Sequence, residues 1–440
     1  MTYFYNTPNR NSGRRILFLK YIFVFVFLWQ FPVLPVFSQN APGQAAESSI
    51  NFYVQKALEK NPQYLAALHD SGQTKSMYES ESMFMQNPML SFALVNVPLA
   101  TFPSLTSDPM TSMSFILEQE ISLPGESLSR KKMALNEYLA KEKDADALRL
   151  MLISKVEGAC YDLVFLYQKK KLLVENRQAL EGIVSVTRTL VSVNKINSAQ
   201  LLKLEARLSQ MANEITETEA MIIRGENELE NLTTQKPEEK KLPLDRLEPE
   251  SIKIPSGFKP ENHPMYKASL AMRERARANK EHEVAKYFPS LKFGADYMVR
   301  QPIPGVSMSG EDMISLRITA PLPLFFAFKE SKSVKAADEG LTRYDQYFEE
   351  TRLRLKTSWQ GEYGMAQNLL TIYSNYHRDI LPRYYASYKA MLGSLSSSQV
   401  SLLDVLDSYR DYLEVSIKEA EVYRDLRKSI SMLKYLGGEK

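Results

Sequence analysis

Cysteine, histidine and glycine are all scarce in this sequence, which has one Cys, four His and 17 Gly among 440 residues. A single cysteine cannot form an intrachain disulfide, so the fold does not depend on a disulfide framework. Cys160 lies in a stretch with helical periodicity and is interpreted as a small packing residue. Because glycine is so infrequent, the chain is predicted to form long uninterrupted elements rather than many tight turns.

Motifs for catalysis and metal binding are missing as well. The sequence has no Cys pair, no His-x-x-x-His, no nucleotide-binding loop and no Gly-x-Ser-x-Gly. Its histidines are scattered along the chain: His69, His263, His282 and His377. His263 occupies the place that Asn61 has in the other half of the chain, which favours a helix-start residue over a metal ligand. We therefore expect neither enzymatic activity nor a resident metal or cofactor.

Residues 1–38 have the order of regions that is typical of a secretory signal peptide. The segment begins with basic residues and contains no acidic one: Arg10, Arg14, Arg15 and Lys20. The apolar run that follows, residues 21–34, is shorter than the ~18 residues needed to cross a bilayer, and a short membrane anchor is the alternative reading. Removing the segment changes the formal charge from +3 to about −1, so charge gives no argument for nucleic-acid binding.

Short motifs recur at an offset of about 200 residues, which indicates a tandem duplication. Asn61-Pro62-Gln63-Tyr64 matches His263-Pro264-Met265-Tyr266, Asn87-Pro88-Met89-Leu90 matches Phe288-Pro289-Ser290-Leu291, and Ile121-Ser122-Leu123-Pro124 matches Ala320-Pro321-Leu322-Pro323. We predict a first repeat over residues 39–232 and a second over 261–440. The charged, proline-rich segment 233–260 is predicted to be an extended connector between them.

Each repeat is predicted to contain a helix, two strands, a long helix and a returning helix. The strands are expected at 89–97, 112–121, 290–300 and 313–320, where apolar and polar residues alternate strictly. Strands of this length suit a bilayer crossing. Four strands cannot close a barrel, and lipid does not tolerate open edges, so transmembrane strands would require several chains to complete one barrel. Two ordinary hairpins on a soluble domain are the alternative.

The helical segments are the strongest signal in the sequence. Long helices are predicted at 126–192, 198–232, 326–392 and 401–436, with a kink at Pro382. At 1.5 Å per residue, a helix of about 65 residues is roughly 100 Å long. Two such rods, each with a returning helix, predict a bundle or a tube rather than a sphere.

The two helix reversals have similar sequences. Asn197 with Gln200, and Ser401 with Asp404, have the spacing of a capping box, in which the first side chain accepts from free backbone N–H groups. Asn194 is a plausible left-handed residue at the end of the preceding helix.

Taken together, these motifs resemble the TolC family of outer-membrane channels over about residues 48–436. The likeness rests on the order and duplicated spacing of four motifs: Leu58-Glu59-Lys60-Asn61-Pro62, Phe288-Pro289-Ser290-Leu291, Pro321-Leu322-Pro323-Leu324-Phe325 and Ser401-Leu402-Leu403-Asp404-Val405-Leu406-Asp407. The resemblance implies a mixed α and β membrane protein. It also implies a homotrimer whose chains each give four strands to one outer-membrane barrel of about 12 strands, continued by a helical periplasmic tunnel.

The resemblance further implies the exit duct of a tripartite efflux system, with an adaptor (membrane fusion) protein and an inner-membrane pump of the RND type as partners. The adaptor would dock on the helix tips, which correspond to Val193, Asn194, Lys195, Ile196, Asn197, Leu395, Ser396, Ser397, Ser398 and Gln399. The family often has Gly where this chain has Asn194 and Ser398, and Ser fits a left-handed turn less well than Asn. The segment Ile121-Ser122-Leu123-Pro124-Gly125 resembles the branch that works with heavy-metal pumps, although Glu126 stands where that branch commonly has Lys.

Two carboxylates match a pair that lines the tunnel entrance in some members of the family. Asp404 and Asp407 are three residues apart and share a helix face, so three chains would place six carboxylates in a cation-attracting ring. In the alternative, Asp404 only caps the helix and Asp407 only faces solvent. The first repeat has Gln200 and Lys203 at these places, so the second repeat alone would supply the ring.

The same sequence features are compatible with two other functions. Type I protein secretion uses the same kind of duct, and a soluble periplasmic helical scaffold would explain the long helices. The scaffold does not explain why alternating strands occur at matched places in both repeats.

Overall fold

The computed structural model describes residues 42–82, 86–122, 124–193, 197–239, 242, 246–288, 290–307, 310–321, 324–325, 328–396, 400 and 402–438. The chain divides into two units, Met1–Asn40 and Ala41–Lys440. The signal peptide predicted at 1–38 lies outside the described residues. All elements below belong to the second unit.

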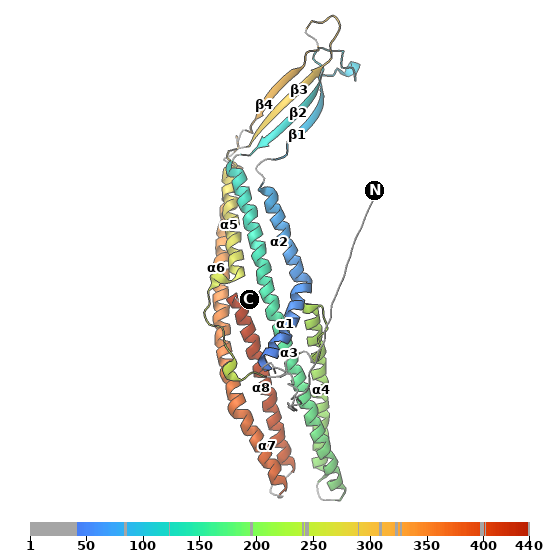
Figure 1. Cartoon of the computed structure of the whole chain (residues 1–440), viewed down its shortest axis with the longest axis vertical. Coiled ribbons are helices and arrows are strands. Elements are labelled where there is room, and N and C mark those ends of the chain that lie inside the picture. Colours follow the sequence, from blue (N-terminus) through green and yellow to red (C-terminus); the bar gives the residue numbers. More distant parts are fainter. Residues whose placement is uncertain are drawn as a thin grey trace, which may run out of the picture. The chain divides into compact units, whose positions relative to one another are not determined.

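Long helices dominate this unit, and four strands interrupt them (Figure 1). The helices are α1 Pro42–Lys60, α2 Pro62–Glu81, α3 Pro124–Ser192, α4 Ser198–Thr233, α5 Pro264–Ala285, α6 Glu330–Asn375, α7 Leu381–Ser396 and α8 Leu402–Gly437. The strands are β1 Met89–Val95, β2 Ser112–Ile121, β3 Leu291–Arg300 and β4 Met313–Thr319. The first repeat opens with two helices, α1 and α2, where one was predicted, because Pro62 begins a new helix after Asn61.

The four strands form one antiparallel sheet in the order β1-β2-β3-β4. The middle pairing, β2 with β3, joins the first repeat to the second, and Phe115 lies opposite Tyr297 there. Each flanking pair, β1–β2 and β3–β4, is a hairpin within one repeat. The two predicted hairpins are therefore joined into one sheet through β2 and β3.

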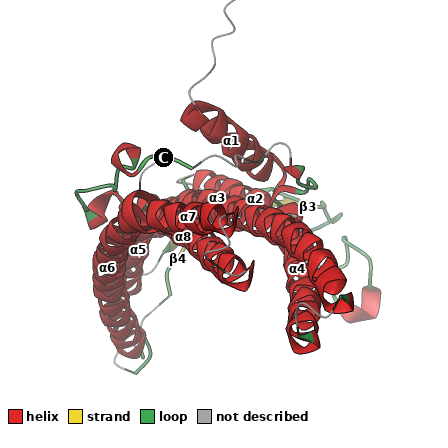
Figure 2. Cartoon of the chain, turned by 90° about the horizontal axis from the view of Figure 1, so that it is seen from below, coloured by secondary structure: helices red, strands yellow, loops and turns green. Residues whose placement is uncertain are grey.

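Helix α3 is 69 residues long and packs against α1, α2, α4, α5 and α8. Seen from below, α3 and α8 lie between α4 on one side and α5 and α6 on the other (Figure 2). One buried cluster joins α1, α3 and α4 around Leu163 and contains Cys160. Helices α3 and α4 approach closely at Gly225, where an added Cβ would lie 2.9 Å from Cδ2 of Leu163.

The second long helix differs from the prediction of one element over 326–392. It begins at Glu330, and a five-residue π-helical turn, Tyr376–Ile380, separates α6 from α7. In this turn the N–H of Leu381 donates to the C=O of Tyr376, five residues earlier. Pro382 follows directly, and its ring cannot donate to the C=O of residue 378. The predicted irregularity at Pro382 therefore takes the form of a π turn, which is one of the known causes of bends in helices.

Candidate functional site

The sheet has an apolar face that is open to the surroundings. The register aligns apolar side chains across all four strands in rows such as Phe92–Phe115–Tyr297–Ile314. Phe92 is 59% exposed and Leu316 is 83% exposed. The other exposed large side chains on this face are Leu90, Leu94, Phe115, Leu117, Phe293, Tyr297, Ile314 and Ile318. In a sheet with one face in water, the apolar residues are normally the buried ones, so this face is inverted relative to a soluble sheet.

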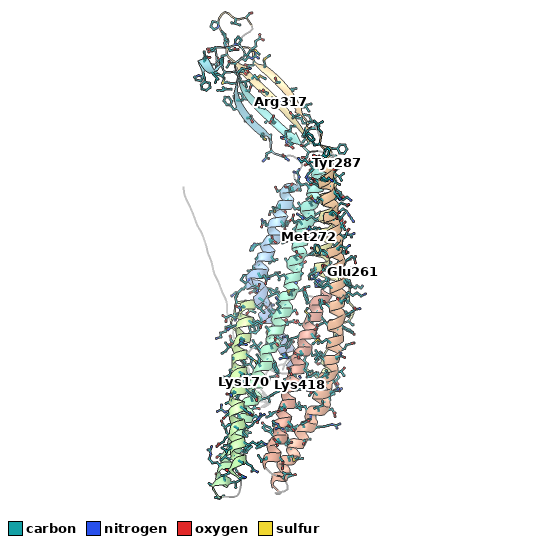
Figure 3. All side chains as sticks on the ribbon, turned by 180° about the vertical axis from the view of Figure 1, so that it is seen from behind. Lys170, Glu261, Met272, Tyr287, Arg317 and Lys418 are labelled. Atoms are coloured by element: carbon teal, nitrogen blue, oxygen red, sulfur yellow. The ribbon has the colours of Figure 1, made fainter. Side chains whose placement is uncertain are left out.

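The opposite face of the same sheet carries the charges. Arg317 of β4, labelled in Figure 3, lies 3.7 Å from Glu118 of β2, across the intervening strand β3. Lys292 of β3 lies 3.4 Å from Glu120 on the neighbouring strand β2. Asp296 and Ser114 on this face are buried. An apolar outside and a polar inside are the pattern of strands that line an aqueous lumen in a membrane.

The outer edges of the sheet carry free hydrogen-bonding groups. In the described part of the chain, no strand pairs with the far side of β1 or of β4. Such edges are templates for another strand, and the apolar rows continue right up to both of them.

The helix tips are described only in part. Val193 follows α3 and is exposed, and Asn197 caps α4 by accepting a hydrogen bond from the N–H of Ala199 at 2.9 Å. The cap predicted at Asn197 is thus present. Leu395 and Ser396 form the end of α7. Residues 194–196, 397–399 and 401 lie outside the described residues, as do the side chains of Leu395 and Ser396.

The two predicted entrance carboxylates lie in the first two turns of α8. Asp404 and Asp407 are both exposed. Arg410 lies 3.2 Å from Asp407 and 2.8 Å from Asp411, so one cation offsets part of this acidic surface. The bond to Asp411 raises the pKa of Arg410 above its usual range, and the guanidinium stays charged.

Sequence reasoning missed an aromatic cluster above this acidic surface. Tyr388 of α7 packs against Tyr409 and Tyr412 of α8, with ring centroids 4.9 Å and 6.2 Å away. Burial raises the pKa of Tyr409 and Tyr412, so both stay neutral. The spacing Tyr385–Tyr388 and Tyr409–Tyr412 is a signal that could have revealed a shared helix face.

A second missed feature is a buried carboxylate. Glu419 of α8 is 1% exposed and forms an ion pair with Arg246 of the connector. Its other oxygen is 2.7 Å from Nδ1 of His377 in the π turn. No sequence motif marks these residues, because they are far apart in the chain.

No group of three or more His, Cys, Asp or Glu side chains in the described part of the chain could hold a metal ion. None of the helices described is both long and apolar enough to cross a membrane.

The sheet with its inverted faces, joined to helices as long as α3, is the fold of outer-membrane channel proteins. The structure is similar to that of CusC, with a TM-score of 0.74 and 17% sequence identity, covering 93% of this chain and 98% of that one. It is also similar to the CmeC outer membrane channel of Campylobacter jejuni (TM-score 0.72, 18% identity, 89% and 86% covered). The MtrE outer membrane channel of Neisseria gonorrhoeae matches with a TM-score of 0.70 and 18% identity, covering 89% of each chain.

These structures confirm, for the fold, the predicted resemblance to the TolC family. No protein-family model and no curated protein sequence matches this chain.

Proposed function

We propose that this protein is the outer-membrane exit duct of a tripartite efflux system and conducts substrates passively from the periplasm to the exterior. The observation that carries the proposal is the exposed apolar face of the sheet, backed by a charged face on the same strands. In water, a patch of this size would drive aggregation or demand a protein partner. In a bilayer it is the surface that contacts lipid, and strands of 7–10 residues have about the length needed.

The proposed assembly is a homotrimer. The free edges of β1 and β4 must be paired before the sheet can enter lipid, because unsatisfied backbone groups there cost several kcal/mol each. Pairing β4 of one copy with β1 of the next satisfies both edges with one contact, and three copies give a barrel of about 12 strands. The similar channel structures support this arrangement.

The partners in this proposal are a periplasmic adaptor and an inner-membrane pump of the RND type. The adaptor would dock on the turns at residues 193–197 and 395–399, between α3 and α4 and between α7 and α8. Asp404 and Asp407 would lie just inside the entrance, on the exposed surface of α8. The likeness in fold to CusC and CmeC supports an export duct over a soluble scaffold.

The first experiment measures the mass and membrane behaviour of the mature chain purified in detergent. We expect a stable trimer of about three times the chain mass that inserts into planar bilayers and gives discrete conductance steps. A monomer that stays soluble without detergent and does not conduct would overturn the proposal in favour of the periplasmic scaffold. A conducting trimer that fails to bind any RND-system adaptor, but assembles with an ABC-type secretion pair, would instead favour type I protein secretion.

A further inference from the structure

The connector between the repeats is attached to α6 and α8 around Leu247. The N–H of Leu247 donates to the hydroxyl of Tyr423 at 3.4 Å, and the hydroxyl of Tyr373 donates to the C=O of Leu247 at 2.8 Å. Ile252 is buried in the same cluster as Tyr373 and Leu426. The connector is thus held by α6 and α8 through both its backbone and its side chains.

A charged cluster lies beside this attachment. We call it the connector clamp and define it as Arg246 and Glu248 of the connector, His377 of the π turn and Glu419 of α8. Arg246 reaches Glu419 and also donates to Oε1 of Gln168 on α3, at 3.1 and 3.3 Å. His377 lies between two carboxylates, with Nδ1 2.7 Å from Glu419 and Nε2 3.4 Å from Glu248.

The two protonation states of His377 fit this geometry differently. A doubly protonated imidazole donates from both nitrogens, one to each carboxylate. A neutral imidazole has a single N–H, which the short contact directs to Glu419, and it then points a lone pair at the Glu248 carboxylate. The contact to the connector is therefore attractive only when His377 carries both protons. Histidine is the side chain that commonly changes charge between pH 5 and 8.

We propose that the contact of His377 with Glu248 is a pH-sensitive link between the π turn and the connector, formed at acidic pH and lost at alkaline pH. It lies beside the Arg378–Glu250 ion pair, which joins the same two segments at both pH values. The π turn is the place where α6 passes into α7, and π turns are frequently found at functional positions in helices. Closing the link restrains this turn from the connector side, while Glu419 restrains it from α8. The proposal concerns this chain's own residues and does not depend on what the duct carries.

Among the other charges around His377, Arg246 shares the Glu419 carboxylate and pairs with its second oxygen. Tyr373 of α6 packs its ring 5.4 Å from the imidazole and donates to the connector backbone. Neighbouring charges already have partners of opposite sign: Arg378 with Glu250, Asp379 with Arg383, and Lys418 with Glu421. Glu248 and Glu419 are therefore the two carboxylates whose contacts with His377 depend on the imidazole.

Hydrogen–deuterium exchange of the full mature protein in detergent tests the link. The backbone amides of residues 246–252 and 376–381 are followed at pH 5.5 and 7.5, after correction for the intrinsic pH dependence of exchange. We expect wild-type protection at both segments to be about threefold higher at pH 5.5, which is the size typical of a half-exposed ion pair. Equal protection at the two pH values would overturn the proposal.

Three variants assign the effect to His377. His377→Gln keeps a neutral donor for Glu419 and should abolish the difference between the two pH values. His69→Gln, an exposed histidine of α2, is the matched control and should leave it unchanged. If His377→Gln does not fold, Glu248→Gln carries the test, since it removes only the exposed acceptor and should reduce the difference by at least half. A pH difference that persists in whichever of these two variants folds would contradict the proposal.

Discussion

The two repeats begin with the same device but build it from different residues. Asn61 starts α2 by accepting from the N–H of Tyr64 at 3.0 Å, and its amide donates to the C=O of Leu232 at 3.1 Å. His263 starts α5 by accepting from the N–H of Met265 at 3.1 Å, and its ring packs edge-on against Tyr435. Both side chains are buried, so each ties the start of one helix to the end of another.

The two repeats differ in how strongly we expect them to respond to pH. The first repeat uses a neutral amide and an unbroken α3, whereas the second uses a titratable ring and a helix broken by a π turn. The two halves thus share an architecture, and we expect the second to respond more strongly to pH.

The largest expected effect tests whether the repeats share one membrane face. Leu90 of β1 and Leu316 of β4 lie in the same cross-strand row. Leu90→Arg and Leu316→Arg should therefore each lower the free energy of unfolding in lipid vesicles by ~2–4 kcal/mol. Ser315→Arg, opposite Asp296 on the polar face, should cost less than about 1 kcal/mol. Urea titration of the vesicle-refolded protein measures all three, and similar costs on the two faces would contradict a lipid-facing surface.

The next largest effect is a pH dependence of stability that we expect from His263 at the start of α5 but not from Asn61 at the start of α2. Burial lowers the pKa of His263 from 6.5 to about 4. Between these values the unfolded chain binds a proton that the folded chain refuses, so stability falls as pH drops from 6.5 towards 4. We expect this group to contribute a loss on the order of 2 kcal/mol to the free energy of unfolding at pH 4.5.

His263→Asn copies the first repeat and should remove that part of the pH dependence. Unfolding of the variant and the wild type is compared at pH 7 and pH 4.5, which cancels the titration of the carboxylates. His69→Gln serves as the control that retains the wild-type loss. If His263→Asn is destabilised by acid as much as the wild type, the ring is not the source of the effect.

The close packing of α3 and α4 should make a glycine substitution in the first repeat change the free energy of unfolding by about 1 kcal/mol more unfavourably than one in the second repeat. Gly225→Ala of α4 forces Leu163 to move, and overpacking of this kind costs ~1–3 kcal/mol, partly offset by the higher helix propensity of alanine. Gly361 of α6 has open space around it, so Gly361→Ala should stabilise by up to ~1 kcal/mol. Thermal unfolding compares the two, and equal shifts would mean that α3 and α4 are not in close contact.

A smaller effect is expected at the π turn. Pro382→Ala restores an N–H that can bond within the helix, so the segment 376–380 should move towards a continuous α-helix like that of α3. We expect slower amide exchange at 376–381 with a stability change below about 1 kcal/mol. Unchanged exchange would mean that packing around Glu419, rather than the proline, maintains the π turn.

The smallest effect concerns the entrance carboxylates, which only the second repeat supplies. Asp404→Asn with Asp407→Asn should lower the cation selectivity of the conducting trimer by about two- to threefold, the scale of exposed charges, and weaken block by multivalent cations. Glu205→Gln, on the corresponding helix of the first repeat, is the matched control. Selectivity that survives the double substitution would sink the ring assignment and leave the fold intact.

Local patterns in the sequence were sufficient for the four strands and for most of the helices and their order, but not for the division between α1 and α2 or for the π turn. Alternation at Leu291–Arg300 predicted β3, and the absence of proline after Glu126 predicted α3, because side-chain period and backbone hydrogen bonding are decided within a few residues. The helix-start roles of Asn61 and His263 followed from their matched places before proline. The adaptor-docking tips and the entrance ring remain predictions.

Only the tertiary structure revealed which distant residues meet. Arg246, His377 and Glu419 are separated by more than 40 residues from one another, and none stands in a recognisable motif. Likewise, the sheet order joins the repeats through β2 and β3, and the π turn forms beside the buried Glu419. The sequence alone determined the strands, their alternating apolar and polar faces, and most of the long helices, since these follow from local periodicity. That the apolar face of the sheet is the exposed one was shown by the tertiary structure. The connector clamp was decided by tertiary structure, because a buried charge is stabilised only by partners that the folded chain brings to it.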